Sequence, residues 1–188
     1  VLNASGYVTA RRAATVSSKF TGKVTEVLIE EGMRVEENQV VARLDDSNVR
    51  ASYNLAAAQL DSARHSQTET EVLLEEARVN LQRTQSLVER ELASDQELDR
   101  IRALSNSLAA QLRRKEADLV VAQRSVDIYQ AQLDDLIIRA PFAGVIISKN
   151  AQPGEMISPV SAGGGFTRTG IGTIVDMSSF EIEIDVNE

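Results

Sequence analysis

The feature that most constrains this chain is a motif that occurs twice, 122 residues apart, around a long stretch without glycine or proline. Residues 20–24, Phe-Thr-Gly-Lys-Val, return at 142–146 as Phe-Ala-Gly-Val-Ile, and residues 31–35 return at 153–157 in the same register. Between the two copies there is no glycine before Gly144 and no proline before Pro141. Because these residues most often interrupt regular structure, the pattern predicts a small, internally repeated domain that carries a long insert.

The insert is predicted to be helical, because residues 47–136 are rich in the good helix formers Ala, Leu, Gln, Glu and Arg. Apolar or small residues recur within it at alternating spacings of four and three, in two series. The first series, with polar Gln67 and Thr70 included, is Val49, Tyr53, Ala56, Leu60, Ala63, Gln67, Thr70, Leu74, Ala77, Leu81, Thr84 and Val88. The second is Leu98, Ile101, Ser105, Leu108, Leu112, Lys115, Leu119, Ala122, Val126, Tyr129, Leu133 and Leu136. A sustained period of 3.5 residues indicates a coiled coil, and we call these two series the seam.

The two series also predict how the chain folds back on itself. Seam positions whose numbers sum to 185 or 186 face each other when the chain reverses near residues 90–95, so that Leu74 meets Leu112. Residues 46–137 are therefore predicted to form one antiparallel hairpin whose arms, at about 1.5 Å per residue, reach about 60 to 67 Å. Thr70 then faces Lys115, and we expect a softer middle there because polar seam residues usually trade stability for register.

The segments on either side of the insert are predicted to be β-structure. Short apolar runs end at turns around Gly32 and Pro153-Gly154, which is typical of a small β-sandwich. The second copy carries an extra loop with Gly163, Gly164 and Gly165, which three consecutive glycines make mobile. Residues 180–186 alternate apolar and acidic side chains, and this predicts a strand that lacks its partners.

Composition excludes several functional classes. The net charge of −8 argues against nucleic acid as the main partner, and 4% aromatic residues leave little for base stacking. There is no cysteine, so neither a disulfide nor a thiolate metal site is expected. The sequence has no initiator Met, signal peptide or apolar run of 18 residues, so we expect that any membrane anchor has been removed or does not exist.

These features together resemble the periplasmic adaptor proteins, or membrane fusion proteins, of bacterial tripartite efflux pumps. The resemblance lies in two lipoyl/biotinyl-like half-motifs around a helical hairpin, with Ala-Pro-Phe-Ala-Gly-Val-Ile opening the second half, and it covers essentially the whole chain. It implies an α+β fold with a lipoyl-like β domain at residues 13–45 and 138–176, the coiled-coil hairpin at 46–137, and stubs of a β-barrel domain at 1–12 and 177–188.

The resemblance also implies partners, a location and a site. The partners are an inner-membrane transporter of the resistance-nodulation-division (RND) or ABC type, a TolC-like outer-membrane channel, and further copies in a hexamer. The protein would lie in the periplasm, anchored to or associated with the inner membrane. In adaptors that engage a TolC-like channel, the hairpin tip carries an Arg, a Leu four residues on and a Ser seven beyond, and Arg83, Leu87 and Ser94 stand at these intervals.

Each of these tip residues also has an ordinary structural interpretation. Leu87 lies one position off the seam, where it either docks a partner or simply widens the apolar stripe, and Arg83 is either a docking contact or a solvated charge. Ser94 begins a Ser-Asp-Gln-Glu capping box that starts the second helix without any partner protein, and both of its roles can coexist.

Other candidate sites are weaker. The hairpin replaces the junction at which lipoyl and biotinyl domains carry their modified lysine, so no cofactor is expected, and no catalytic residues are found. His65 has no histidine or cysteine companion and is not expected to bind a metal. Asp45 and Asp46 are interpreted as helix-capping residues. The alternatives to an efflux adaptor are a carrier domain with a modified lysine, a coiled-coil scaffold that dimerises, and an adaptor for type I protein secretion.

Overall fold

The computed structural model describes residues 4–159, 167–168, 170–178 and 180–186. The chain divides into two compact units, which are described separately. One comprises Val1–Asn48 and Ala131–Glu188 and holds the strands, and the other is Val49–Gln130 and is helical. The α+β class predicted from the sequence, a helical hairpin inserted into a β domain, is confirmed.

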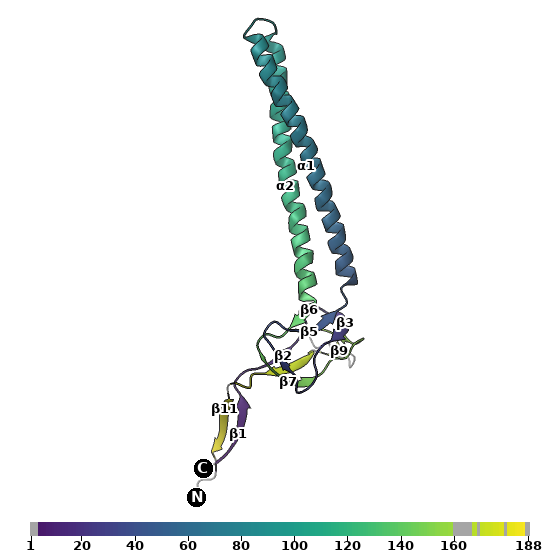
Figure 1. The fold of residues 1–188 in the computed structure, drawn as a ribbon, viewed down its shortest axis with the longest axis vertical. Coiled ribbons are helices and arrows are strands. Elements are labelled where there is room, and N and C mark those ends of the chain that lie inside the picture. Colours follow the sequence, from purple (N-terminus) through teal and green to yellow (C-terminus); the bar gives the residue numbers. More distant parts are fainter. Residues whose placement is uncertain (1–3, 160–166, 169, 179, 187–188) are drawn as a thin grey trace. The chain divides into compact units, whose positions relative to one another are not determined.

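The insert consists of two helices, α1 (Ser47–Val88) and α2 (Asp95–Asp135), joined by residues 89–94. They run side by side as an antiparallel hairpin whose turn forms its tip (Figure 1). Every buried residue of α1 belongs to the predicted seam: Ala56, Leu60, Thr70, Leu74, Ala77 and Thr84. The buried residue of α2, Ser105, is also a seam residue, so the 3.5-residue period is confirmed as the packing face.

The seam leucines of α2 are only half-buried. Each of them has one neighbouring helix to pack against, which covers only one side of the side chain. The leucines concerned are Leu98, Leu108, Leu112, Leu119 and Leu133. The pair of helices buries Ala77 of α1 but leaves one side of these five leucines open to solvent. The hairpin therefore keeps apolar surface along its length that it cannot bury by itself.

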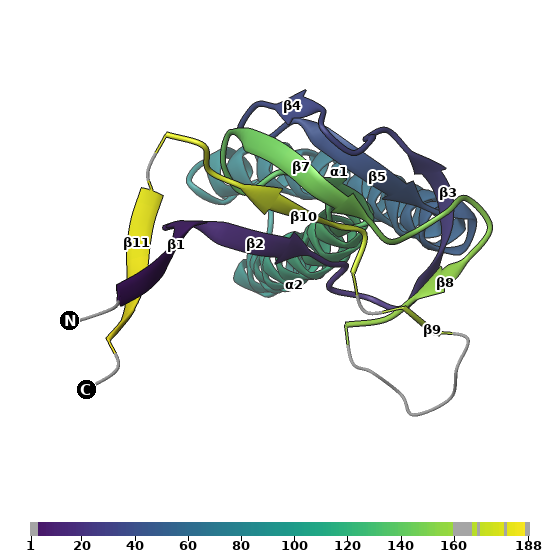
Figure 2. The ribbon, with the colours of Figure 1, turned by 90° about the horizontal axis from the view of Figure 1, so that it is seen from below.

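The β unit contains eleven short strands in the part of the chain that the structure describes. They are β1 (Ala4–Ala10), β2 (Ala13–Val16), β3 (Gly22–Val27), β4 (Arg34–Val35), β5 (Val40–Leu44), β6 (Ile137–Arg139), β7 (Gly144–Lys149), β8 (Met156–Ile157), β9 (Thr167–Arg168), β10 (Gly172–Val175) and β11 (Phe180–Val186). One sheet has the order β2-β10-β7-β4, as seen in Figure 2, and another has the order β6-β5-β3-β8-β9. Fully buried aliphatic side chains from both sheets, among them Val24, Val41, Ile146 and Ile174, form the core.

The sequence repeat is present as a structural repeat in which each copy completes the other. β3 and β7 are separated by 122 residues, as are β4 and β8, yet β4 pairs with β7 and β3 pairs with β8. Gly32 N–H donates to the Ile146 carbonyl at 2.8 Å, and Gly154 N–H donates to the Val24 carbonyl at the same distance. Both glycines have positive φ, 82° and 94°, which only glycine adopts readily.

The extra length of the second copy is confined to one place. Ala42 of the first copy pairs with Ile138, and the matching pair in the second copy is Gly172 with Val16. Gly172 stands 130 positions after Ala42, so eight additional residues separate it from the preceding matched strand, β8. The predicted loop with Gly163, Gly164 and Gly165 falls in this interval and lies outside the described residues, so its role stays a prediction.

The strand expected near the end of the sequence does find one partner. β11 pairs with β1 in a separate two-stranded antiparallel sheet, in which Val8 lies opposite Ile182 and Ala10 opposite Phe180. Val8, Phe180 and Ile182 remain more than half exposed. The expectation of an unpaired strand was therefore wrong in part, since β1 supplies one neighbour and leaves the apolar face open.

Candidate docking site at the hairpin tip

The hairpin tip is an ordered turn that closes the end of α1. Leu92 N–H donates to the Leu87 carbonyl at 2.8 Å, and Glu91 N–H donates to the Val88 carbonyl at 2.9 Å. These two bonds form a Schellman motif, in which the residue after the helix adopts a left-handed conformation. That residue is Glu91, with φ of 57°, where glycine is usual. The observed turn at 89–94 is within one residue of the expected tip at 90–95.

The start of α2 is capped by Ser94. Its Oγ accepts the backbone N–H of Glu97 at 3.3 Å, and its carbonyl accepts the N–H of Leu98 at 3.2 Å. The predicted capping box forms only in its first half, because the Glu97 carboxylate instead accepts two hydrogen bonds from Arg100, at 2.9 and 2.7 Å. These hydrogen bonds from Arg100 lower the pKa of Glu97 below its ordinary value.

Arg83 and Leu87 lie one helical turn apart near the end of α1, and both reach the surface. The Arg83 guanidinium has one hydrogen bond, to Asn80 Oδ1 at 3.4 Å along the same helix, which leaves most of its donors facing solvent. Leu87 is 37% exposed, whereas its seam neighbour Thr84 is 8% exposed. The position of Leu87 is therefore compatible with both interpretations. It widens the apolar stripe, and it is exposed enough near the tip to dock a partner.

A further apolar residue at the tip was missed by sequence reasoning. Leu92 is 71% exposed and follows Arg90 and Glu91 in the turn. The signal was present in the sequence, because a leucine among charged residues outside the 4-3 spacing has no place in the seam. With Leu87 it gives the tip two exposed apolar side chains, which is the pattern of an interface anchor surrounded by polar residues.

The two sides of the hairpin differ in chemistry. In an antiparallel helix pair, the residues that precede the first seam position of each heptad lie on one side, and those that follow the second seam position lie on the other. The first side, which we call the neutral flank because Glu97 and Asp118 are its only charged residues, includes three exposed leucines: Leu73, Leu87 and Leu104. The opposite side, the charged flank, includes six exposed charged residues: Arg50, Arg64, Glu71, Arg78, Arg102 and Glu116. Apolar surface is thus concentrated on one side of the hairpin.

Charged residues in the β unit are largely engaged in structural contacts. An open groove of about 870 Å³ is lined by Glu26, Arg43 and Asp45, among others. Glu26 and Arg43 form an ion pair at 3.4 Å. Asp45 Oδ1 accepts the Ser47 hydroxyl at 2.6 Å and the Ser47 N–H at 3.0 Å, which confirms the capping prediction for Asp45. The hydroxyl bond is the main reason that the pKa of Asp45 is lowered.

The other weighed candidates can also be placed. His65 is exposed and lies 3.6 Å from Asp61, one turn earlier in α1. Over the described ranges, no group of three or more His, Cys, Asp or Glu residues is arranged to hold a metal ion. None of the helices in the described part of the chain combines enough length and apolarity to span a membrane.

A long helical hairpin inserted between the interlocked halves of a small β-sandwich defines the class of barrel-sandwich hybrid proteins with a hairpin insert. Residues 12–162 match the family described as "CzcB-like, barrel-sandwich hybrid domain". The chain belongs to this family.

Relatives and solved structures agree with this assignment. Multidrug resistance protein MdtA of Photorhabdus laumondii subsp. laumondii is 31% identical over 153 residues, which cover 81% of this chain and 35% of that protein. The crystal structure of MacA from Actinobacillus actinomycetemcomitans has a TM-score of 0.84 at 20% identity, covering 97% of this chain and 54% of that one. A membrane fusion protein from Streptococcus pneumoniae R6 has a TM-score of 0.67 at 21% identity, covering 97% and 66%. The predicted resemblance to membrane fusion proteins is confirmed, and the chain spans about a third of the length of the curated relatives it matches.

Proposed function

We propose that this chain is the hairpin and lipoyl-like portion of a periplasmic adaptor that links an inner-membrane transporter to a TolC-like outer-membrane channel for efflux of drugs or other small molecules. The observation that carries the proposal is the tip, where a rigid turn presents Leu87 and Leu92 beside Arg83. Two ordered caps hold this surface in place, so that little conformational entropy is lost on docking. The similarity to the multidrug resistance protein MdtA supports the same role.

Self-association is part of the proposal. The neutral flank leaves Leu73 and Leu104 about half exposed, and an interface between neighbouring hairpins would cover them. Because the two flanks differ, one flank of each copy would pack against the opposite flank of the next. Such head-to-tail contacts form a ring when the rotation from copy to copy closes. The ring would be a hexamer, and its hairpins would form a tube through which substrate passes without chemistry. Gly163, Gly164 and Gly165 would line or gate this passage.

The roles proposed for the tip residues follow from their chemistry. Leu87 would be the apolar anchor, and Arg83 would pair with an acidic or carbonyl group of the channel. Ser94 would contribute a hydroxyl beside its capping role. The segments 1–12 and 177–188, which contain β1 and β11, would belong to a barrel domain. The RND or ABC transporter would be held by other parts of the protein, in the periplasm at the inner membrane.

The test is binding of this chain to a purified TolC-like channel, compared with binding of Leu87→Asp and Arg83→Glu. Val72→Asp is the matched control, because Val72 is an exposed apolar residue of α1 several turns before Arg83. Circular dichroism first confirms that every variant stays helical. Loss of binding in the two tip variants with binding retained in the control supports the proposal. Equal binding by all variants would overturn the docking site.

The second candidate is a coiled-coil scaffold that dimerises through its helices, which the half-buried seam leucines also favour. It predicts a stable dimer in solution that forms without the β unit. Analytical ultracentrifugation of the whole chain and of residues 47–135 separates the two functions, because a dimer of the isolated hairpin with no channel binding would favour the scaffold.

A further inference from the structure

The middle of the hairpin differs from its two ends in how the helices pack. Towards the base, Ala56 and Leu60 are buried, and towards the tip Thr70, Leu74 and Ala77 are buried. Between them, the seam positions Ala63 and Gln67 are only half-buried. On α1 this is the longest interval between buried seam residues, since Leu81 alone separates buried Ala77 from buried Thr84.

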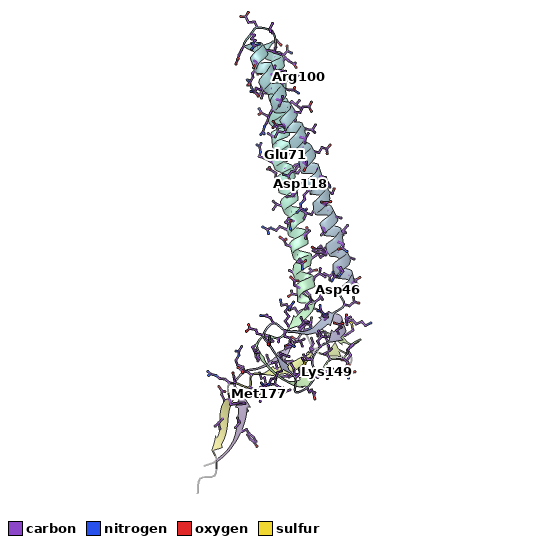
Figure 3. All side chains as sticks on the ribbon, in the orientation of Figure 1. Asp46, Glu71, Arg100, Asp118, Lys149 and Met177 are labelled. Atoms are coloured by element: carbon purple, nitrogen blue, oxygen red, sulfur yellow. The ribbon has the colours of Figure 1, made fainter. Side chains whose placement is uncertain are left out.

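A groove of about 280 Å³ lies at this interval. It is lined from both helices by Gln59, Ser62, Ala63, Ser66, Lys115 and Asp118. Since Ala63 and Lys115 are seam positions, the groove enters the contact between the helices and is not just a surface hollow. Figure 3 shows Asp118 about halfway along the hairpin, with Glu71 nearer the tip.

The polar groups around the groove do not bind the helices together. The side chains of Lys115 and Asp118 make no hydrogen bond or ion pair with any residue in the described ranges. Thr70 is buried, but its hydroxyl donates to the Ser66 carbonyl of its own helix at 3.0 Å. Thr68 does the same to the Arg64 carbonyl at 3.1 Å. Such bonds back to the preceding turn weaken a helix slightly and often bend it.

The sequence of α1 is also less favourable to helix at this level than in the stretch that follows it. Five of the nine residues from 62 to 70 are Ser, His or Thr, whereas residues 71–79 contain none of these. Ser, His and Thr have lower helix propensity than Leu, Glu, Arg and Ala. Weak propensity, an open seam and a polar groove thus coincide in one segment.

We propose that the hairpin consists of two separately packed seams joined by a yielding segment, residues 62–70 of α1 with 115–119 of α2, which opens before either seam does. Opening this segment exposes little apolar surface, and its polar groups other than Thr70 are already exposed or half-exposed, so its local unfolding is less unfavourable than that of the flanking stretches. The part of the hairpin beyond Thr70, with its tip, can then bend relative to the part before Ser62. This inference does not depend on the proposed function.

Hydrogen exchange of the whole chain, followed by mass spectrometry, tests the proposal. Backbone amides of 62–70 are expected to exchange at least about tenfold faster than those of 74–84, as regions of low local stability do. A variant with Gln67→Leu and Lys115→Leu is expected to fill the seam and slow exchange at 62–70 to the rate of 74–84. The matched control is Arg114→Leu, which removes the neighbouring charge at an exposed position outside the seam and should leave the pattern unchanged.

Two results would overturn the yielding segment. One is equal protection of 62–70 and 74–84 in the native chain, and this comparison decides the question even if the double variant fails to fold. The other is that the double variant slows exchange equally along both helices, or slows it no more than the control does. Either outcome would show that the substitutions act on the whole hairpin and not on residues 62–70.

Discussion

The Leu87 carbonyl accepts the N–H of Leu92 at 2.8 Å, so the residue proposed to dock a partner also closes the turn that presents it. Between them Glu91 holds a left-handed conformation, with φ of 57°, which is strained for a residue with a side chain. The backbone of the tip is thus ordered even though Glu91 occupies a left-handed position that glycine would favour.

Glu91→Gly is expected to stabilise the hairpin by about 1 kcal/mol, because glycine adopts positive φ without strain. The measurement is urea unfolding followed by circular dichroism at 222 nm. Gln85→Gly is the control, since Gln85 is exposed and helical, and glycine there should destabilise by a similar amount. Destabilisation by both substitutions would show that the Glu91 conformation is not strained.

The two roles of Ser94 can be separated by substitution. Ser94→Ala removes the side-chain acceptor for Glu97 N–H and should cost about 1 kcal/mol, with fraying of the first turn of α2. Ser94→Asp keeps a good capping residue and should preserve stability, but it places a charge at the tip. If Ser94 contacts the channel, Ser94→Asp weakens binding without loss of helix. Unchanged binding would leave Ser94 as a cap alone.

The parts of the fold that could be predicted from the sequence are those with a period. Burial of Leu74 and Ala77 follows from a 4-3 spacing, because only that spacing keeps residues on one side of a supercoiled helix. The repeat with an offset of 122 likewise predicts matching strands and turns at Gly32 and Gly154. Both the 4-3 spacing and the repeat are regular patterns of residue types, and such patterns can be found in a single sequence.

The sequence could not predict which of two equally suitable partners a strand or a side chain takes. The repeat is compatible with β3 pairing to β4 inside one copy or to β8 of the other, because the side-chain pattern is the same. At the tip, Glu97 has two partners within reach, the cap and Arg100, and the charged guanidinium is the stronger donor. Leu92 was missed because it lies in a turn, where no period applies.

The two matched glycines of the repeat predict an asymmetry. A Cβ added at Gly144 would lie 2.5 Å from the Val175 carbonyl oxygen, which is backbone and cannot move aside. At Gly22 the nearest atom is Leu44 Cδ1 at 3.1 Å, which belongs to a side chain that can adjust. Gly144→Ala should therefore destabilise the β unit by about 1–3 kcal/mol and Gly22→Ala by less. Calorimetric unfolding of both variants checks this, and equal losses would contradict it.

Asp45 provides a pH-dependent contact at the start of α1. Its pKa is lowered in the folded chain, chiefly because the Ser47 hydroxyl donates to the carboxylate. A lowered folded pKa means that the contact stabilises the fold above the unfolded pKa, and that this contribution is lost as the pH falls through the folded pKa. In Ser47→Ala the pKa of Asp45 should rise towards its ordinary value, whereas Ser47→Thr should keep it low. Carbon-detected carboxylate titration by NMR measures both, and an unchanged pKa in Ser47→Ala would refute the assignment.

The difference between the two flanks of the hairpin gives a prediction about assembly. In an arrangement where the neutral flank of one copy meets the charged flank of the next, Leu73 of one hairpin approaches Glu71 of its neighbour, because both residues lie at the same level on opposite sides of α1. The chain has no cysteine, so single cysteines introduced at these positions report contacts without background. The experiment is oxidation of Leu73→Cys alone, of Glu71→Cys alone, and of an equal mixture, with products separated on non-reducing gels.

In the head-to-tail arrangement, only the mixture forms disulfide-linked dimers, because each single variant places its cysteine on one side of the contact. A double variant, with Leu73→Cys and Glu71→Cys in one chain, should form a series of larger disulfide-linked oligomers. Its two thiols point to opposite sides of the helix and cannot join within one chain. Dimers from Leu73→Cys alone would instead indicate a symmetric contact between two neutral flanks, which is the behaviour expected of a dimeric scaffold. Such a result would replace the proposed ring with a symmetric dimer. It would not bear on whether the tip binds a channel, which the binding experiment tests.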